Sequence, residues 1–325
     1  MPREPGDSVV VITGASSGIG RATAHALAER GASVVLAARS EHSLREVAEE
    51  CEAAGGRALA VTTDVADKEA VQELARQAAE RFGRIDVWVN NAGVMVYGYF
   101  EQIPDQTYRR VIETNLFGQI NGARAVLPYF REQESGGVLI NVSSLWGRMF
   151  SPYVSAYTTS KFGVRAFSES LREALADVEN VDVCTILPAS VDTPIFRHAA
   201  NYTEYAAKPV PPIADPDRAV KAILRCIERP RREVTVGQFG HLEAVVQEVT
   251  SGPFNWLAPY VMKWAAFGSE SAEPGPGNVF EPMPEWNRVS GGWRRERNAM
   301  LRRGALTGGA ALGTLVAYRI ARRLW

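Results

Sequence analysis

The sequence predicts an α/β fold built on a doubly wound, parallel sheet of about seven strands. Short apolar segments rich in β-branched residues alternate with segments of helical period from residue 8 to about residue 240. The apolar segments are hydrophobic throughout instead of at every second position, which is typical of strands covered by helices on both faces. Crossovers in such a sheet are right-handed, and ligands bind at the carboxyl ends of its strands.

The expected elements alternate regularly along the chain. Strands are expected at 8–13, 33–38, 58–63, 85–90, 181–187 and 232–237, and in the apolar run that ends before Ser143. Helices are expected at 22–31, 41–54, 67–82, 105–130 and 215–230, and in the segment that begins near Tyr157.

The composition is that of an ordinary globular protein, with 46% hydrophobic and 22% charged residues. The three cysteines are far apart and form no C-x-x-C pair, so they predict neither a zinc site nor a disulfide framework. The first ten residues lack a basic segment followed by an apolar one, and we therefore expect no secretory signal. These features predict a cytoplasmic protein without a bound metal ion.

The C-terminal tail is strongly basic. Residues 288–325 hold nine arginines and one acidic residue, a net charge of +8, while the remaining 27 basic and 36 acidic residues give −9. An uncharged stretch, Gly304–Tyr318, lies between arginines. As a helix it would reach about 22 Å, less than the roughly 30 Å of a bilayer core. The tail is therefore equally consistent with contact to a membrane and with docking on the protein itself. The apolar run within it disfavours a nucleic-acid partner.

Four segments are expected from these shifts in composition. Residues 1–240 form the domain that contains the sheet, and residues 241–267 form an apolar helical extension. Residues 268–298 are rich in proline and glycine and are expected to be a linker. Residues 299–325 form the basic, apolar C-terminal helix, a candidate membrane anchor.

A glycine turn follows the first strand. The segment 13–20 reads TGASSGIG and leads directly into a helical pattern. A strand, a tight turn and a helix in this order aim backbone N–H groups and the positive end of the helix at one point, which favours a phosphate. Gly14 suits the turn, while Gly18 and Gly20 allow a close approach of cofactor and helix. A turn without a ligand is the alternative interpretation.

Polar residues follow the next strands. Arg39 stands at the end of the second strand, where an acid would hold the ribose 2′-hydroxyl of NAD, and it suits the 2′-phosphate of NADP instead. Asp64 follows the third strand and either meets the adenine amino group or caps a turn. After the fourth strand, Asn91 is followed by Ala92 and Gly93, which leave room for a flat ligand.

Tyr157 and Lys161 are four residues apart at the start of a helical segment, so both lie on one helix face. A nearby ammonium favours the phenolate and lowers the pKa of the phenol from about 10. Tyrosine then becomes a general acid or base. A Tyr/Lys pair on a solvated helix surface is the alternative interpretation, because i,i+4 pairs recur by chance in any long helix.

These motifs together resemble the short-chain dehydrogenase/reductase family over residues 8 to about 240. The resemblance rests on TGASSGIG, on NNAG at 90–93, on Ser144 with Tyr157-x-x-x-Lys161, and on PASVDTP at 188–194, where Ala189 replaces the usual glycine. It implies a Rossmann-fold, NAD(P)-dependent oxidoreductase that pairs as a homodimer or homotetramer through its long helices.

The resemblance also implies a role for each site residue. Asn115 would hold a water against the lysine, Ser144 would orient the substrate carbonyl, and Ser143 would be structural. The expected catalytic residues are Asn115, Ser144, Tyr157 and Lys161. The residues expected to bind the cofactor, with NADP(H) preferred over NAD(H), are Gly14, Ser16, Ser17, Gly18, Ile19, Gly20, Arg39, Asp64, Val65, Asn91, Ala92, Gly93, Tyr157, Lys161, Pro188, Val191 and Thr193.

The substrate is expected to be a bulky, apolar alcohol or ketone, such as a lipid or steroid. Aromatic and apolar residues gather in the loops near the expected site, namely Trp146, Met149, Phe150, Tyr153, Phe196 and Tyr202. Residues 195–214 show no clear period, and they form either a mobile lid over it or an ordinary surface loop. The alternative is an NADP-binding scaffold or sensor that its basic tail recruits to a membrane or partner. The complete set of Asn, Ser, Tyr and Lys disfavours this alternative.

Overall fold

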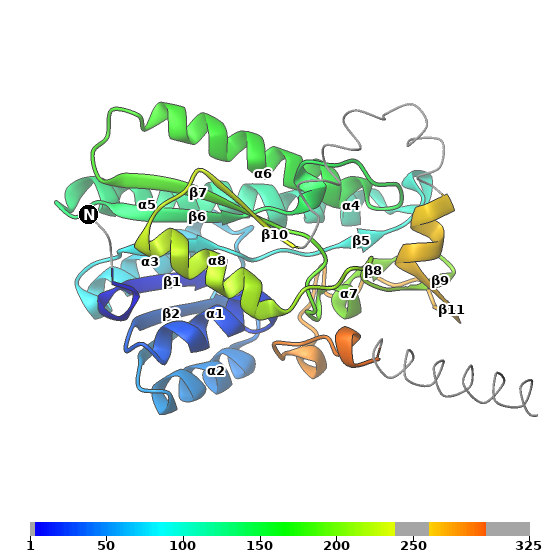
Figure 1. The fold of residues 1–325 in the computed structure, drawn as a ribbon, viewed down its shortest axis with the longest axis horizontal. Helices are drawn as coiled ribbons and strands as arrows, with labels where there is room; N and C mark the ends of the chain where they lie inside the picture. The colour runs from blue at the N-terminus through cyan, green and yellow to red at the C-terminus, as the bar shows by residue number, and fades with distance from the viewer. Residues whose placement is uncertain (1–3, 238–259, 297–325) are drawn as a thin grey trace, which may run out of the picture. The chain divides into compact units, whose positions relative to one another are not determined.

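The computed structural model describes residues 4–237 and 260–296, which are drawn in colour in Figure 1. The chain divides into two compact units, residues 1–291 and 292–325. The first unit contains the sheet and all the elements described below.

A seven-stranded sheet forms the centre of the first unit, and all of its strands are parallel. In spatial order the strands are β10 (Glu233–Val236), β7 (Val181–Pro188), β6 (Gly137–Val142), β4 (Val87–Asn90), β1 (Val9–Thr13), β2 (Ser33–Ala38) and β3 (Arg57–Thr62). This confirms the predicted doubly wound sheet. The strand order reverses between β1 and β4, the point at which ligands bind in such sheets.

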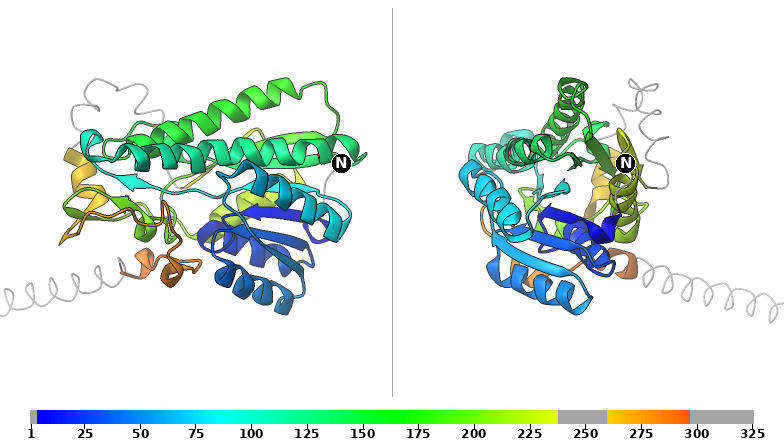
Figure 2. Two further views of the ribbon diagram at one scale, coloured as in Figure 1. Left: turned by 180° about the vertical axis from the view of Figure 1, so that it is seen from behind. Right: turned by 90° about the vertical axis from the view of Figure 1, so that its left-hand side faces the viewer.

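Helices cover both faces of the sheet (Figure 1 and Figure 2). One apolar cluster joins the sheet to α1 (Gly18–Ala28), α2 (Glu41–Ala53) and α8 (Pro216–Glu228). A second cluster joins it to α3 (Lys68–Phe82), α5 (Gly118–Glu132) and α6 (Ser155–Ala174). The five inner strands are buried along most of their length, whereas the edge strands β3 and β10 are mostly half-buried. Burial on both faces is why the sequence shows continuous apolar runs.

The long helix predicted at 105–130 is divided by a π-helical turn. It consists of α4 (Asp105–Ile112), the π turn η3 (Glu113–Phe117) and α5. Short 3-10 turns occur at η1 (Pro5–Asp7), η2 (Phe100–Gln102), η4 (Leu145–Gly147) and η5 (Pro284–Trp286). π turns are often found at functional sites, and this one contains Asn115.

The segment after β7 has more regular structure than the lid predicted at 195–214. It contains α7 (Ile195–His198), β8 (Ala200–Asn201) and β9 (Tyr205–Ala207). Strand β8 pairs with β5 (Val96–Tyr97), and β9 pairs with β11 (Phe267–Ser271). These backbone bonds attach the segment to the rest of the unit at both of its strands.

Residues 268–291 also differ from the linker predicted there. This part of the chain contains β11 and η5, and Val279 is fully buried in an apolar cluster with Val94 and Val96. Its proline and glycine content is linker-like, but its backbone is hydrogen-bonded to the core, as described below. Glycine and proline here allow turns within a packed segment.

The remaining predictions for the C-terminus fall largely outside the described residues. These are the rest of the apolar extension, at 241–259, and the basic helix at 299–325; at 260–266 the extension is helical. Within residues 4–237 and 260–296, no helix is long and apolar enough to cross a membrane. The cytoplasmic location stays a prediction.

Candidate active site

A cavity of about 890 Å³ lies at the carboxyl ends of the strands. The structure brings together there all the residues predicted to bind cofactor except Gly20, and all those predicted to be catalytic except Asn115. One continuous space therefore runs from the glycine turn to Tyr157 and Lys161.

The glycine turn has the geometry of a phosphate cradle. Gly14 has a φ of +67°, and a Cβ atom there would lie 2.8 Å from Cα of Ala92. Gly20 does not line the cavity, because it packs on the turn: its Cβ would lie 2.2 Å from the Gly14 carbonyl oxygen. Asn91 Nδ2 donates to the carbonyl of Gly14 at 3.2 Å and holds the turn in place.

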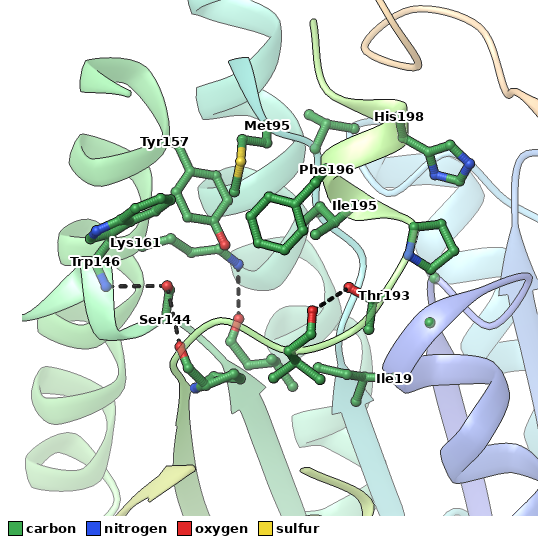
Figure 3. A pocket seen from close by; sticks show the side chains of 18 of the residues that line it. Ile19, Met95, Ser144, Trp146, Tyr157, Lys161, Thr193, Ile195, Phe196 and His198 are labelled. Carbon is green, nitrogen blue, oxygen red and sulfur yellow. Dashed lines mark hydrogen bonds between the residues drawn. The ribbon is translucent and has the colours of Figure 1, made fainter. Parts of the chain in front are cut away.

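Tyr157 lies near the start of α6 and is 5% exposed. Its ring meets Trp146 edge to face, and its hydroxyl lies beside the side chain of Ser144 (Figure 3). Burial raises the pKa of Tyr157 to about 12, while the neighbouring Ser144 side chain acts in the opposite direction. The phenol is therefore the stable form at neutral pH, the form that can give up a proton.

Lys161 lies one turn further along α6. Its Nζ donates to the carbonyl of Val142 at 2.9 Å and lies 5.6 Å from the centroid of the Tyr157 ring (Figure 3). Burial lowers the pKa of Lys161 to about 7. The i,i+4 pairing is as predicted, but the lowering of the Tyr157 pKa is not. Desolvation disfavours both charged forms and outweighs the attraction between them.

The two serines after β6 have different positions. Ser144 Oγ accepts the Trp146 N–H at 3.1 Å and contacts the Pro188 carbonyl at 3.5 Å, beside the Tyr157 hydroxyl (Figure 3). Ser143 Oγ donates to the Lys161 carbonyl at 2.8 Å and ties β6 to α6. Of the two, Ser144 has the placement of a substrate-orienting group, and Ser143 has that of a structural one.

Asn115 lies behind the cavity rather than in its wall. Its Oδ1 accepts the Val94 N–H at 2.8 Å, and its Nδ2 donates to the Val94 carbonyl at 2.9 Å and to Ser160 Oγ at 3.0 Å. A Cβ on Gly93 would lie 3.3 Å from Asn115 Oδ1 and 3.5 Å from Lys161 Nζ. The side chain thus holds the segment after β4 against α6, and its predicted contact with a water stays a prediction.

Arg39 lines the cavity but has partners that the sequence did not indicate. Its Nη1 donates to the carbonyls of Val279 and Phe280 at 3.1 and 2.8 Å, and its Nη2 donates to the carbonyl of Asn278. Among the described residues, the Nε–H and one Nη2 proton remain for a ligand. Asp64 accepts a hydrogen bond from the Ala66 N–H and forms an ion pair with Arg110. It therefore caps a turn, which is one of the two roles predicted for it.

The loop after β7 accepts alanine where glycine was expected. Ala189 is not among the described non-glycine residues with positive φ, and its N–H donates to the Val236 carbonyl at 2.8 Å. Thr193 follows at the cavity wall, with its Oγ1 3.5 Å from the Val191 carbonyl. Nothing in this backbone requires glycine at position 189.

Several cavity residues were not predicted individually, although the 195–214 segment was expected to lie over the site. Some come from the C-terminal part of the chain, including Val261, Trp264, Asn278 and Met283, and others from the 195–214 segment, including His198 and Val210. Of the aromatic residues expected near the substrate, Trp146, Phe150 and Phe196 line the cavity with Met149, whereas Tyr153 and Tyr202 do not. The place of His198 near the cavity could have been predicted from the sequence, since it follows Thr193 of the 188–194 motif by five residues.

A phosphate-type glycine turn at the switch point of a doubly wound sheet, joined by one cavity to a tyrosine and a lysine, defines a dinucleotide-binding oxidoreductase. A family profile described as short chain dehydrogenase matches residues 8–203, and the chain belongs to this family.

The chain is also similar to individual proteins of known sequence. It is 34% identical over 329 residues to the uncharacterized oxidoreductase YxnA of Bacillus subtilis (strain 168), which covers 98% of this chain and 91% of YxnA. It is 33% identical over 280 residues to 11-beta-hydroxysteroid dehydrogenase A of Sesamum indicum, covering 82% of this chain and 76% of that protein.

Solved structures show the same fold. A short chain dehydrogenase/reductase from Burkholderia phymatum in complex with NAD has a TM-score of 0.70 at 26% identity, covering 77% of this chain and 96% of that one. An alcohol dehydrogenase from Thermococcus sibiricus complexed with 5-hydroxy-NADP has a TM-score of 0.62 at 28% identity, covering 70% of this chain and 95% of that one. The two complexes hold different forms of the cofactor.

Proposed function

We propose that this dehydrogenase/reductase, which acts on CH–OH groups, uses NADP(H) to interconvert bulky apolar alcohols and carbonyl compounds. The observation that carries the proposal is the single cavity that joins the glycine turn to Ser144, Tyr157 and Lys161. The cradle fits a dinucleotide, because Gly14 and Gly18 both take left-handed backbone angles, which form the tight turn without a side chain over it. The amide of Ile19, at the N-terminal end of α1, has no partner among the described residues.

A bound nicotinamide dinucleotide supplies the hydride in reduction and accepts it in oxidation. Ser144 Oγ orients the substrate oxygen, and Tyr157 gives its hydroxyl proton to that oxygen as negative charge develops on it. The high pKa of Tyr157 keeps the phenol protonated and suits this step. In the reverse direction Tyr157 takes the proton, and protonated Lys161 stabilises the phenolate.

Arg39 supports a preference for NADP(H). The strand that it follows ends in Ala37 and Ala38, so no carboxylate is present there to bind a ribose 2′-hydroxyl. The Nε–H and the remaining Nη2 proton of Arg39 can donate to a 2′-phosphate. The similar structures do not decide between the two cofactors, because the Thermococcus sibiricus enzyme holds an NADP-type ligand and the Burkholderia phymatum enzyme holds NAD.

The cavity wall supports an apolar substrate. Trp146, Met149, Phe150 and Phe196 line the cavity together with Ile195 and Met95. Figure 3 shows Trp146 and Met95 beside Tyr157. Large apolar side chains of this kind bind by removing apolar surface from water, at about 25 cal/mol per Å². The steroid substrate in the name of the Sesamum indicum relative agrees with a bulky apolar class.

The test is NADPH consumption by the wild-type protein and by Tyr157→Phe with a panel of steroid, long-chain and short polar ketones. We expect turnover with the apolar ketones and a loss of about 10²–10⁴ in kcat for Tyr157→Phe. Full turnover by Tyr157→Phe with any accepted ketone would remove Tyr157 from the mechanism. Activity on short polar ketones alone would contradict the apolar substrate class.

The cofactor preference has a separate test. NADPH and NADH are titrated against the wild-type protein and against Arg39→Ala, and we expect the preference for NADPH to fall in the variant. A preference for NADPH that Arg39→Ala leaves unchanged would show that another residue reads the 2′-phosphate.

A further inference from the structure

A C-terminal strap, residues 276–291, is bound to the β1–β2 side of the cavity by backbone groups. Arg39 donates to the carbonyls of Asn278, Val279 and Phe280. The N–H of Gly18, in the glycine turn, donates to the carbonyl of Arg288 at 2.9 Å. The strap therefore contacts the same two places, the glycine turn and the end of β2, that bind the phosphates of a dinucleotide in this class of fold.

The strap is also bound to the opposite side of the cavity, formed by the loop and helix after β7. The N–H of Asn278 donates to the His198 carbonyl at 2.8 Å, and the Trp286 ring lies 4.9 Å from the Arg197 guanidinium. Asn278 thus joins the two sides directly, because its N–H is bound to His198 and its carbonyl to Arg39. The strap bridges the two walls of the cavity and forms part of the boundary, through Asn278, Pro282, Met283 and Asn287.

Two polar atoms at this bridge lack partners. His198 is 5% exposed and lines the cavity, and its Nε2 has no hydrogen-bond partner among the described residues. The buried Oδ1 of Asn278 is likewise without a partner in that part of the chain. A buried polar group without a hydrogen-bond partner is destabilising, so two such atoms beside one cavity indicate polar groups that a ligand satisfies.

We propose that His198 and the strap are a further part of the cofactor site, in which His198 Nε2 binds a phosphate of the dinucleotide and Asn278 the adjoining ribose. The inference rests on the proposed function, since it assigns ligands for the same cofactor. The imidazole N–H and the two remaining N–H groups of Arg39 are donors for phosphate oxygens, and the Asn278 Oδ1 is an acceptor for a ribose hydroxyl.

The electrostatics of His198 agree with this role. Burial lowers the pKa of His198 to about 4, Glu285 acts against this effect, and Arg39 adds to it. The imidazole is therefore neutral at neutral pH. A phosphate group beside it supplies the negative charge that favours the imidazolium, which strengthens the hydrogen bond.

Gly277 sets the position of the strap at this point. It has a φ of +51°, and a Cβ there would lie 2.2 Å from the His198 carbonyl oxygen. Gly275, two residues earlier, has nothing within 4 Å of its Cβ position. Alanine at 277 must displace the strap from His198, whereas alanine at 275 leaves it in place, so the two substitutions form a matched pair.

The experiment measures the Kd of NADPH and of NADH by fluorescence titration of the full-length protein. We expect His198→Leu to bind NADPH about 10-fold to 100-fold more weakly than wild type, because a hydrogen bond to a charged group is lost. His198→Gln places a donor near the position of Nε2 and should recover most of the affinity. Gly277→Ala should bind more weakly than Gly275→Ala, and the latter should match wild type.

The comparison of cofactors identifies the phosphate. A loss confined to NADPH places His198 at the 2′-phosphate, and an equal loss with NADH places it at the diphosphate. Wild-type affinity in His198→Leu would overturn the proposal, as would tighter binding by Gly277→Ala than by Gly275→Ala, which would make the strap an obstacle. A wild-type protein that binds neither dinucleotide would instead overturn the proposed function itself.

Discussion

Burial of Lys161 makes the stability of the protein depend on pH. The side chain is 3% exposed, and burial lowers its pKa to about 7, whereas the unfolded chain has an ordinary lysine pKa of about 10.4. Between these two values the unfolded state binds a proton that the folded state does not. The free energy of unfolding therefore rises with pH through this window, and the full cost of burying Lys161 is present only below about pH 7.

The magnitude follows from the two pKa values. Between pH 7 and pH 9 the contribution of Lys161 to the free energy of unfolding increases by about 2 kcal/mol. Lys161→Met keeps an unbranched apolar stem and removes the titrating group, so it should lack this increase. Tyr157 does not interfere, because its pKa is raised to about 12 and its effect begins above the ordinary tyrosine value of about 10.

The assay is urea denaturation of both proteins at pH 7 and pH 9. The difference in free energy of unfolding between wild type and Lys161→Met should shift by about 2 kcal/mol in favour of wild type at the higher pH. The same difference at both pH values would refute the reasoning, since it would mean that Lys161 keeps its ordinary pKa in the fold.

Two pairs of substitutions also test the site. Ser144→Ala should lower kcat by about 10²–10³ in steady-state kinetics, because it removes an oriented hydroxyl. Ser143→Ala should mainly lower the free energy of unfolding, by about 1–3 kcal/mol in urea denaturation. Equal kinetic losses in the two variants would contradict the division of roles. Gly14→Ala should weaken NADPH binding and cost about 1–2 kcal/mol of stability for left-handed backbone, plus the clash with Ala92. Gly83→Ala is its control, because Gly83 has a φ of +78° with nothing within 4 Å of its Cβ position, and similar NADPH affinity in these two variants would mean that the space at Gly14 is not needed.

The parts of the fold that the sequence predicted are those in which side chains carry the signal. Strand β2 was predicted with its observed bounds, because continuous β-branched residues identify a strand buried on both faces. The glycine turn and the placement of Tyr157 and Lys161 on one helix face were also predicted from the sequence, since turns and helix faces depend on particular residues at particular intervals. Most of the site follows from these local patterns.

The parts that the sequence did not predict depend on backbone groups or on distant packing. The strap binds Arg39 through backbone carbonyls, which every residue has. The side chains of residues 278–280 therefore do not distinguish the strap from a linker. The pKa of Lys161 depends on burial by segments far away in the chain, which spacing on one helix does not reveal. The π turn around Asn115 was also missed, because the Asn115 side chain is bound to Val94 and Ser160, which are distant in the sequence.

The most direct test of the central claim is the fate of the hydrogen at C4 of the nicotinamide. The wild-type protein is incubated with an apolar ketone and NADPH carrying deuterium at the transferable C4 position, and the alcohol is analysed by mass spectrometry. We predict deuterium on the carbinol carbon, with far less product from Tyr157→Phe. An alcohol without deuterium from NADPH labelled at either face, or labelled cofactor consumed without alcohol, would contradict hydride transfer at this site.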